Sequence, residues 1–581
     1  MHTSFQTIAR ENAAQHHSRE ELKTEGAHYT PDHLAGFVAR QLSGLLTSKH
    51  KSPLRVLDPA TGDGALLVAL LGALSNAGIE DVEVYGFELS SASMTVASER
   101  LQKLFPKASI QLSQGDFLAY VLENHGCHPL TLFDAPTEAT RFDVVIANPP
   151  YVRTQVMGAA ESQRLAEHFG LTGRVDLYHA FLMGIARVLE PGGVAGVIVS
   201  NRFMTTRSGM SIRGDLLRQF HPLHVWDLGD TKLFSAAVLP AVLLLERKNG
   251  QIRPSESARF TSIYSSKLEG KAFAVPNAID ALDHQGLVET WDGRRFSVEH
   301  GLLDHGSSEE DVWRISTETG DAWLQTVQTN TWSVFGDVGK IRVGVKTTAD
   351  KVFIRKDWHK LDSGELPELL RPLTTHHIAR RFKADSQSNT RGIVYPHVLI
   401  DGKRSAAKLE DYPKTKRYLE SHREALESRT YVIEGGRNWF EVWVPQDPDA
   451  WRHPKLVFRD ISEQPTFWLD LDGTIINGDC YWMICNDHAD DELLWLALAV
   501  GNSTFIEAFY DRRFNNKLYA GRRRFMTQYV EQFPLPDPVR EESQAIIQLA
   551  KQIYELTPSG GADELFSELD RLVWSAFGVT S

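Results

Sequence analysis

Asn148, Pro149, Pro150 and Tyr151 follow an apolar run and place an amide and an aromatic ring beside two prolines that cannot continue a strand. Residues 142–147 read FDVVIA, which predicts a short strand buried on both faces of a parallel sheet. Proline fixes its own φ, has no N–H to donate and restricts the residue before it, so two prolines impose a rigid, extended exit. That exit would hold the Asn148 amide and the Tyr151 ring still. The structural alternative is a proline-terminated strand capped by a tyrosine.

A glycine-containing loop follows the first predicted strand. Glycines there let backbone approach a ligand closely, as in dinucleotide-binding folds. No Gly-Lys-Ser/Thr follows to cradle phosphates, so the ligand is not expected to be a nucleoside triphosphate. Glycine-rich turns are common, and the loop alone is a weak signal. Its candidate cofactor-binding residues are Asp58, Pro59, Ala60, Gly62 and Gly64.

Two more strand ends carry groups suited to a nucleoside. Glu88 ends the second predicted strand, where a carboxylate can accept hydrogen bonds from both ribose hydroxyls. Asp116 and Phe117 end the third, and could hold an adenine amino group and cover the base. A solvated strand-end acid is the alternative for each carboxylate. Four such strand ends in sequence order favour a common adenosine-bearing cofactor.

These residues need a sheet to bring them together. Strand-like segments at 55–60, 82–89, 109–116 and 142–148 are followed by three more at 192–201, 224–230 and 241–248, and helical patterns separate most of them. This alternation predicts a doubly wound α/β sheet, with the ligand at the carboxyl ends of its strands. The last two strands have too short a connection for a crossover helix and should be antiparallel. We therefore expect a seven-stranded, mostly parallel Rossmann-like sheet with one reversed strand.

With 581 residues, the chain should form more than one domain. Residues 1–250 contain the predicted sheet, and 251–330 are polar and weakly periodic, as expected of a connector. Residues 331–536 are rich in tryptophan and arginine and predict a mixed α/β domain, and 537–581 predict a helical tail.

Composition limits the possible partners. The net charge of −13 argues against a polyanion-binding surface over the whole molecule, but not against a local basic cleft. The three cysteines form no metal-ligand pattern, so neither a metal site nor a disulfide is expected. No long apolar stretch or signal peptide is apparent, which predicts a cytoplasmic protein without a membrane partner.

The ordered motifs DPATGDG, Glu88, GDF and NPPY resemble those of S-adenosylmethionine-dependent amino methyltransferases. GAHYTP at 26–31 resembles the extra N-terminal motif of Taq-type DNA adenine methyltransferases. The resemblance is close over 24–250 and looser in VGKIRVGVKTTADKVFI and NGDCYWMI. It implies S-adenosylmethionine as cofactor, no metal, and Tyr29 and Thr30 closing over its methionine end. Thr30 could also cap a helix beginning at Pro31.

The family resemblance gives the NPPY motif a chemical role. Asn148, through its side-chain oxygen, and Pro149, through its carbonyl, would accept both hydrogens of an adenine amino group, while Pro150 keeps the acceptors rigid. A base inside duplex DNA must be flipped out to reach such a pocket. Tyr151 would cover one face of the extruded base, and Phe234 matches the family position that covers the other.

The same resemblance implies that residues 331–536 form a target-recognition domain that binds double-stranded DNA. Arginines among aromatic residues could position the protein on phosphates and read base edges. Each basic run taken singly is more typical of a solvated face. The candidate DNA-binding residues are Arg380, Arg381, Arg437, Arg512, Arg513, Arg522, Arg523 and Arg524.

The sequence thus predicts a bacterial or archaeal, nucleoid-associated DNA adenine-N6 methyltransferase, the modification component of a restriction-modification system. Amino methylation of ribosomal RNA, a protein glutamine or cytosine N4, and a non-catalytic DNA-binding defence protein remain alternatives. About 25 residues precede GAHYTP, too few for a fused nuclease domain. We therefore expect no DNA cleavage by this chain, and a separately encoded restriction endonuclease could be its partner. We also expect the protein to act as a monomer.

Overall fold

The computed structural model describes residues 30–46, 52–125, 140–152, 158–171, 176–234, 238–250, 257–309, 311–361, 364–385, 390–486, 491–515, 517–557 and 560–580. The chain forms two compact units. The first contains Met1–Thr317 and the short segment Leu518–Gly521, and the second contains Glu318–Lys517 and Arg522–Ser581.

A mostly parallel sheet runs through the first unit. Its strand order begins β3-β2-β1-β4-β5-β7-β6, and β7 is antiparallel to both β5 and β6. These strands confirm the predicted seven-stranded sheet with one reversed strand. The order turns back between β1 and β4, which is where such folds bind ligands. The strands are β1 (Leu54–Asp58), β2 (Val82–Glu88), β3 (Ser109–Gln114), β4 (Phe142–Ala147), β5 (Leu189–Ser200), β6 (Phe220–Asp227) and β7 (Pro240–Arg247).

The sheet continues beyond β6 through residues that were expected to be part of a connector. β8 lies parallel beside β6, and β11, β10 and β9 follow, with β12 paired to β11. The difference arises because polar residues interrupt the apolar ones along these strands: in β8, Thr261 and Ser262 lie between Phe260 and Ile263 and are buried with them. We call these strands the sheet extension: β8 (Arg259–Ser265), β9 (Phe273–Val275), β10 (Gly286–Thr290), β11 (Arg295–Asp304) and β12 (Arg314–Ser316).

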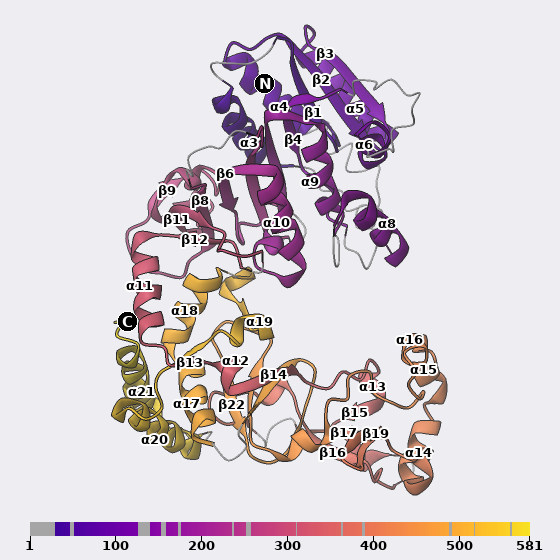
Figure 1. Cartoon of the computed structure of the whole chain (residues 1–581), viewed down its shortest axis with the longest axis vertical. Coiled ribbons are helices and arrows are strands. Elements are labelled where there is room, and N and C mark those ends of the chain that lie inside the picture. Colours follow the sequence, from indigo (N-terminus) through magenta and orange to yellow (C-terminus); the bar gives the residue numbers. More distant parts are fainter. Residues whose placement is uncertain are drawn as a thin grey trace. The chain divides into compact units, whose positions relative to one another are not determined.

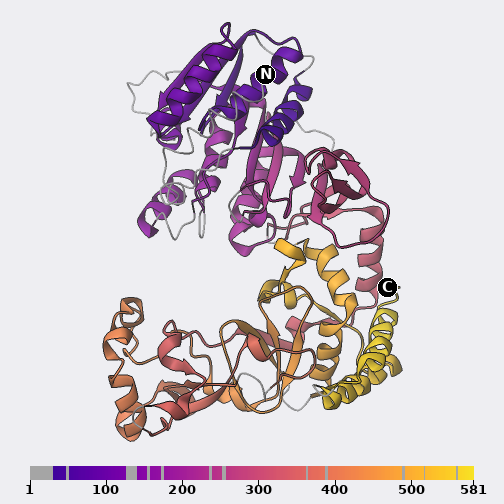
Figure 2. The same ribbon diagram turned by 180° about the vertical axis from the view of Figure 1, so that it is seen from behind.

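Helices cover both faces of the sheet (Figures 1 and 2). Residues of α3, α4 and α5 contribute to one apolar core, which also includes side chains of the sheet extension. Residues of α6, α9 and α10 contribute to a second core. The helices are α3 (Asp32–Leu45), α4 (Ala65–Asn76), α5 (Ser91–Leu104), α6 (Phe117–His125), α8 (Ala159–Phe169), α9 (Leu177–Val188) and α10 (Met210–Gln219).

The second unit combines small sheets with helices, as predicted for 331–536. One four-stranded sheet has the order β14-β24-β20-β22, and another has the order β15-β17-β16-β23. The fully buried rings of Trp468 and Trp482 form part of its core. The strands of these sheets are β14 (Gly339–Val343), β24 (Cys480–Cys485), β20 (Lys455–Arg459), β22 (Phe467–Asp470), β15 (Ile354–Arg355), β17 (Arg391–Val394), β16 (Leu370–Thr374) and β23 (Ile475–Ile476). Smaller pairs join β13 (Ser333–Val334) to β26 (Pro534–Leu535), β18 (His397–Ile400) to β19 (Lys403–Ala406), and β21 (Ile461–Ser462) to β25 (Arg523–Arg524).

Helices complete this unit and form its end. The predicted helical tail is present as α20 and α21, which pack on each other. The helices are α11 (Glu318–Thr329), α12 (Phe335–Val338), α13 (Asp350–Phe353), α14 (Pro413–Glu420), α15 (Arg423–Glu427), α16 (Thr430–Glu434), α17 (Asp491–Asn502), α18 (Thr504–Phe514), α19 (Thr527–Val530), α20 (Glu541–Leu556) and α21 (Asp563–Ala576).

Among the described residues, no single helix is long and apolar enough to cross a membrane. The sharply bent pair α17 and α18 meets the length and composition together. Most residues of α17 are buried within the second unit, as expected of a core helix.

Candidate functional site

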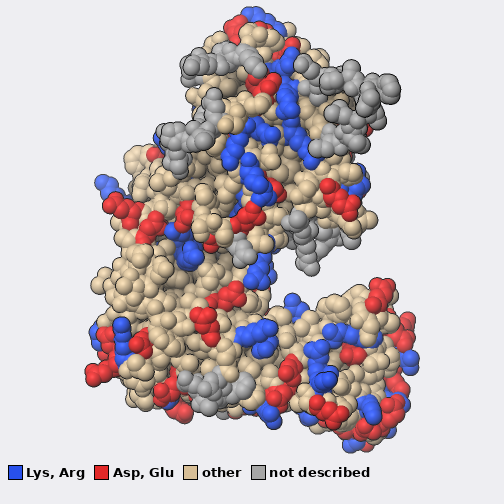
Figure 3. Space-filling view, in the orientation of Figure 1, with Lys and Arg blue, Asp and Glu red and all other residues tan. Residues whose placement is uncertain are grey.

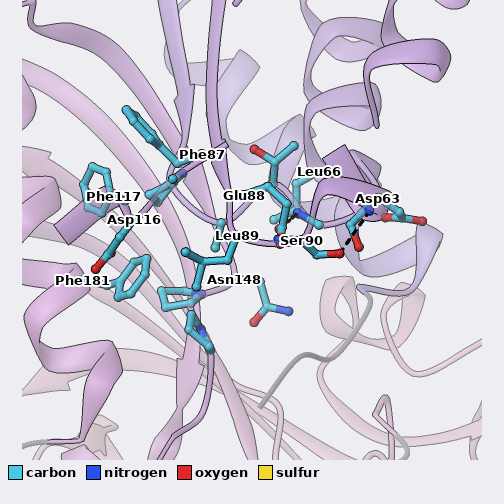
Figure 4. A pocket seen from close by; sticks show the side chains of 18 of the residues that line it. Asp63, Leu66, Phe87, Glu88, Leu89, Ser90, Asp116, Phe117, Asn148 and Phe181 are labelled. Atoms are coloured by element: carbon cyan, nitrogen blue, oxygen red, sulfur yellow. Dashed lines mark hydrogen bonds between the residues drawn. The ribbon is translucent and has the colours of Figure 1, made fainter. Parts of the chain in front are cut away.

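A cavity of 670 Å³ lies at the carboxyl ends of β1, β2, β3 and β4 in the first unit (Figure 4). The predicted residues that line it are Thr30, Pro59, Ala60, Gly62, Glu88, Asp116, Phe117, Asn148, Pro149, Pro150 and Tyr151. Further lining residues, not singled out from the sequence, are Thr61, Asp63, Ala65, Leu66, Phe87, Leu89, Ser90, Ser91, Ala92, Ser93, Gln114, Gly115, Val152, Leu177 and Phe181. The structure therefore brings all four predicted strand ends to one cavity.

The loop after β1 has a backbone conformation that requires glycine at two positions. Gly62 and Gly64 have φ values of +54° and +80°, which L side chains rarely adopt. Gly64 does not line the cavity, and a Cβ there would lie only 3.2 Å from the Cβ of Ala97 on α5. The N–H of Thr61 donates to the carbonyl of Phe87 on β2, at 2.9 Å. The loop is thus fixed against the neighbouring strand and helix.

Glu88 is oriented by two backbone donors. Its Oε2 accepts from the N–H of Gly62 at 2.8 Å, and its Oε1 accepts from the N–H of Ser90 at 2.8 Å. Each carboxylate oxygen can accept more than one hydrogen bond, so the group can still receive ribose hydroxyls. A preoriented carboxylate on this wall fits an adenosine-bearing cofactor.

Asp116 and Phe117 form an adjacent wall. The Oδ1 of Asp116 accepts from the N–H of Leu118 at 2.8 Å, which holds the carboxylate at the start of α6. The ring of Phe117 packs against those of Phe87 and Phe181, with centroids 5.8 and 5.6 Å away. Figure 4 shows these three rings together on one side of the cavity. Phe87 precedes Glu88 and Phe181 lies inside a helix, so only the assembled fold reveals their role as lining residues.

Asn148 is tied to the segment before α3. Its Nδ2 donates to the hydroxyl oxygen of Thr30 at 3.1 Å, and Thr30 is 5% exposed. The helix α3 begins at Asp32, one residue later than expected, so that Pro31 and not Thr30 is its N-cap residue. The amide nitrogen is directed at Thr30, so the amide oxygen points the other way. Tyr29, its predicted partner in cofactor binding, lies outside the described residues.

The two predicted stacking rings have different environments. Tyr151 lines the cavity, and burial raises the pKa of its phenol, which stays neutral. Phe234 does not line it: its side chain is 8% exposed and belongs to the apolar core that contains α3 and α4. The structure thus brings Tyr151 and Asn148 to the same cavity, whereas Phe234 is not among the residues that line it.

Asp58 lies behind the cavity and does not line it. Its carboxyl is fully buried, and its Oδ1 accepts from the N–H of Ala60 at 3.0 Å. Burial raises the pKa of Asp58 to about 7, and the nearby carboxylates of Glu88 and Asp63 add to the effect. Asp63 is itself paired with Arg100 of α5, at 2.9 Å. The carboxyl of Asp58 is therefore a buried titratable group beneath the loop after β1.

Several of the arginines predicted to bind DNA are engaged within the second unit. Arg523 donates to Asp511 at 2.7 and 2.8 Å and to Glu507 at 3.1 Å, and only 14% of its side chain is exposed. Arg524 donates to Asp460 at 3.1 and 3.2 Å. The guanidinium of Arg381 lies over the ring of Phe566, and that of Arg437 over Trp443.

The remaining predicted arginines are more accessible. Arg522 is exposed and makes no ion pair within the described chain, and Arg513 is half-buried. Arg512 is exposed and its guanidinium lies over Trp323, while the Arg380 side chain is 55% exposed and lies 3.9 Å from Asp385. In Figure 3, basic and acidic side chains are interspersed over the part of this unit that carries α13–α16. That part includes ion pairs such as Arg423 with Glu427, as expected of a solvated face.

The seven-stranded sheet and the cavity at its switch point define a class I methyltransferase, and S-adenosylmethionine is its methyl donor. Residues 83–234 match the model of the Eco57I restriction-modification methylase family, and residues 401–535 match that of the TaqI-like C-terminal specificity domain. The chain belongs to the Taq-type DNA methyltransferases of restriction-modification systems, which carry a C-terminal specificity domain.

Similarity extends over the whole chain. The Type II methyltransferase M.BanIII of Aneurinibacillus aneurinilyticus is 38% identical over 96% of this chain and 97% of its own length. A release factor glutamine methyltransferase of Moorella thermoacetica is 32% identical, but over only 25% of this chain and 46% of its own length. Among solved structures, a DrdV–DNA complex aligns with a TM-score of 0.52 at 12% identity, covering 92% of this chain and 57% of that one. The last match concerns the fold alone.

Proposed function

We propose that this chain transfers a methyl group from S-adenosylmethionine to N6 of an adenine flipped out of double-stranded DNA. The observation that carries the proposal is the shared cavity: Asn148, Pro149, Pro150 and Tyr151 line the same space as Glu88 and the loop after β1. A substrate amino group held by the first set would lie beside a methyl donor held by the second.

The residues of the motif answer a specific chemical problem. The amino nitrogen of adenine is a poor nucleophile because its lone pair is delocalised into the ring. The Oδ1 of Asn148 and the carbonyl of Pro149 would accept its two hydrogens and favour a pyramidal nitrogen with a directed lone pair. The bond from Asn148 to Thr30 supports this orientation, and fixed acceptors lower the barrier by preorganisation.

The proposed methyl transfer requires no metal, because the methyl donor carries its own leaving group. When bound, S-adenosylmethionine supplies an electrophilic methyl group with a neutral thioether as leaving group. The amino nitrogen held by Asn148 and Pro149 would take this methyl group as the sulfur–carbon bond breaks with its electron pair on sulfur, and one amino proton would pass to water.

Base flipping costs about a few kcal/mol, and stacking on a ring returns about 1–3 kcal/mol. Tyr151 is proposed to cover one face of the adenine, and Phe234 the other. Because Phe234 packs in a core in this structure, its role requires the chain after Thr231 to carry the ring to the base. The second unit is proposed to position the duplex through its accessible arginines, Arg380, Arg512, Arg513 and Arg522.

We also propose that the protein acts as a monomer alongside a separately encoded endonuclease. Methylation of cytosine N4, RNA or a protein glutamine uses related chemistry, whereas a non-catalytic DNA-binding protein would transfer no methyl group. These alternatives give different products and are outcomes of the same experiment.

The test is long-read modification sequencing of DNA from cells that express the protein or its Asn148→Ala variant. We expect one sequence motif to carry N6-methyladenine and to lose it in the variant. Asn124→Ala changes an exposed amide on α6 and serves as the matched control, with modification retained. N4-methylcytosine, or no modified motif with a protein that binds S-adenosylmethionine, would refute the proposal.

A further inference from the structure

The turn after β6, Leu228–Thr231, is held from several directions. The buried carboxylate of Asp227 starts it, and accepts from the amide of Asn201 at 2.9 Å and from the hydroxyl of Tyr264 at 2.6 Å. Tyr264 belongs to β8, the first strand of the sheet extension. The next residue, Ser265, donates its N–H to the Oδ1 of Asp230 at 2.7 Å. The turn is thus built into the sheet extension.

The backbone of the turn touches the extension directly. Gly229 has a φ of +48°, and a Cβ there would lie 2.2 Å from the carbonyl oxygen of Ile263. No other residue fits so close an approach without moving the backbone of β8. The turn therefore cannot shift toward the extension.

Arg294 forms the last anchor before Phe234. From the connection between β10 and β11, its guanidinium donates to the carbonyl of Thr231 at 2.7 Å and to Asp292 at 2.8 Å. Lys232, the next residue, has a φ of +56°, which a non-glycine residue holds only when its surroundings impose it. Chain before Lys232 is therefore fixed, and Phe234 follows two residues later.

We propose that Arg294 is a positioning residue for the target base. It holds the carbonyl of Thr231, so that the segment carrying Phe234 starts from a fixed point when the ring moves to the extruded adenine. This inference rests on the proposed function. The sheet extension then has a task in the reaction although none of its residues lines the cavity.

The neighbouring Arg295 provides a matched control. Its guanidinium donates to Glu289 at 2.9 Å and to the carbonyl of Leu268 at 2.9 Å. Arg295 therefore links parts of the sheet extension to each other and does not contact the turn after β6 through these bonds. Arg294→Gln and Arg295→Gln each remove one charged donor from the same hairpin. Arg294→Lys keeps a charged donor that can reach a carbonyl, and should restore function.

The experiment compares wild type with these three variants by hydrogen exchange, cofactor binding and methyl transfer. In Arg294→Gln we expect faster exchange at residues 228–234, a Kd for S-adenosylmethionine within twofold of wild type, and kcat/KM for DNA lower by roughly 10-fold. Arg295→Gln should match wild type in hydrogen exchange at residues 228–234, in the Kd for S-adenosylmethionine and in kcat/KM for DNA. Arg294→Lys should recover most of kcat/KM.

Equal exchange and equal kcat/KM in Arg294→Gln and Arg295→Gln would overturn the inference. A parallel loss of cofactor binding and thermal stability in Arg294→Gln would also overturn it, since it would indicate a merely structural role. If wild type modifies no adenine, the proposed function fails and with it the role in base positioning. Exchange at residues 228–234 still reports separately whether Arg294 anchors the turn.

Discussion

The side-chain amide of Asn148 donates to the hydroxyl of Thr30 at 3.1 Å, joining residues that are 118 positions apart in the sequence. Asn148 directly follows β4, and Thr30 precedes α3. The bond fixes which end of the amide faces Thr30. The orientation of the proposed catalytic acceptor is therefore set by a residue outside the motif.

Thr30→Val should lower kcat for methyl transfer by about 10-fold or more, because the Asn148 amide loses the acceptor that orients it. Single-turnover transfer with saturating cofactor and DNA measures this rate. Thr30→Ser keeps the hydroxyl and should stay close to wild type. A Thr30→Val enzyme with wild-type kcat would show that the hydrogen bond has no role in orienting the amide.

The carboxyl of Asp58 should make stability depend on pH. Its pKa is raised from 3.8 to about 7, so the folded state holds the proton more tightly than the unfolded state. Stability from this group is fully present below pH 4 and is lost as the pH rises through 7. The change amounts to up to about 4 kcal/mol. In Asp58→Asn, the unfolding free energy of the first unit, measured with urea, should depend less on pH between pH 4 and pH 8.

Glu99→Gln, at an exposed position on α5, is the control for this pH dependence and should leave it unchanged. An Asp58→Asn protein whose stability varies with pH as wild type does would show that another group titrates in this range.

The buried pair of Lys455 and Asp470 should be important for folding of the second unit. The ammonium is 0% exposed, lies 2.9 Å from the carboxylate and also donates to the carbonyl of Trp451. Lys455→Ala leaves a buried carboxylate without its cation and should cost about 3–5 kcal/mol in unfolding free energy. Tryptophan fluorescence during urea unfolding measures it.

Lys107 and Glu80 form a comparison pair at the surface, with 84% and 67% of their side chains exposed. Lys107→Ala should cost less than about 1 kcal/mol. Equal costs for the two lysine variants would contradict the distinction between buried and exposed pairs.

Arg522 and Arg523 are adjacent, but should affect different properties. Arg522→Ala should reduce the slope of log Kd for DNA against log salt by about 0.9 and leave stability unchanged, as expected for one lost phosphate contact. Arg523→Ala should instead lower the unfolding free energy, because Glu507 and Asp511 each lose a charged partner, although Lys517 remains 3.4 Å from Asp511. Fluorescence anisotropy over a salt series and thermal unfolding separate the two effects. A stable Arg522→Ala protein with an unchanged slope would remove Arg522 from the DNA contacts.

The parts of the site that could be predicted are those encoded locally. Asn148 before two prolines, Gly62 in its loop and Glu88 at a strand end each reveal their position through neighbours in sequence, and the parallel sheet brings them together. The reversed strand β7 was predictable for the same reason, because a short connection permits only antiparallel pairing.

The features that could not be predicted from the sequence depend on contacts with residues elsewhere in the chain. Arg523 and Arg524 were predicted only as DNA contacts, and their ion pairs with Asp511 and Asp460 become visible only when the fold places these carboxylates beside them. The sheet extension has diluted apolar patterning and needs β6 as a template. Phe234 carries no local signal for the direction of its ring, which packing against the core decides.

The segment Leu518–Gly521 has a practical consequence for engineering. It lies within the range matched by the specificity-domain model, yet it groups with the first unit, where the hydroxyl of Tyr519 donates to the carbonyl of Val238 at 2.6 Å. A chimaera that exchanges everything after Thr317 would replace this tyrosine together with the specificity domain. Grafts intended to change the recognised sequence should therefore use a discontinuous boundary and retain residues 518–521 of the recipient.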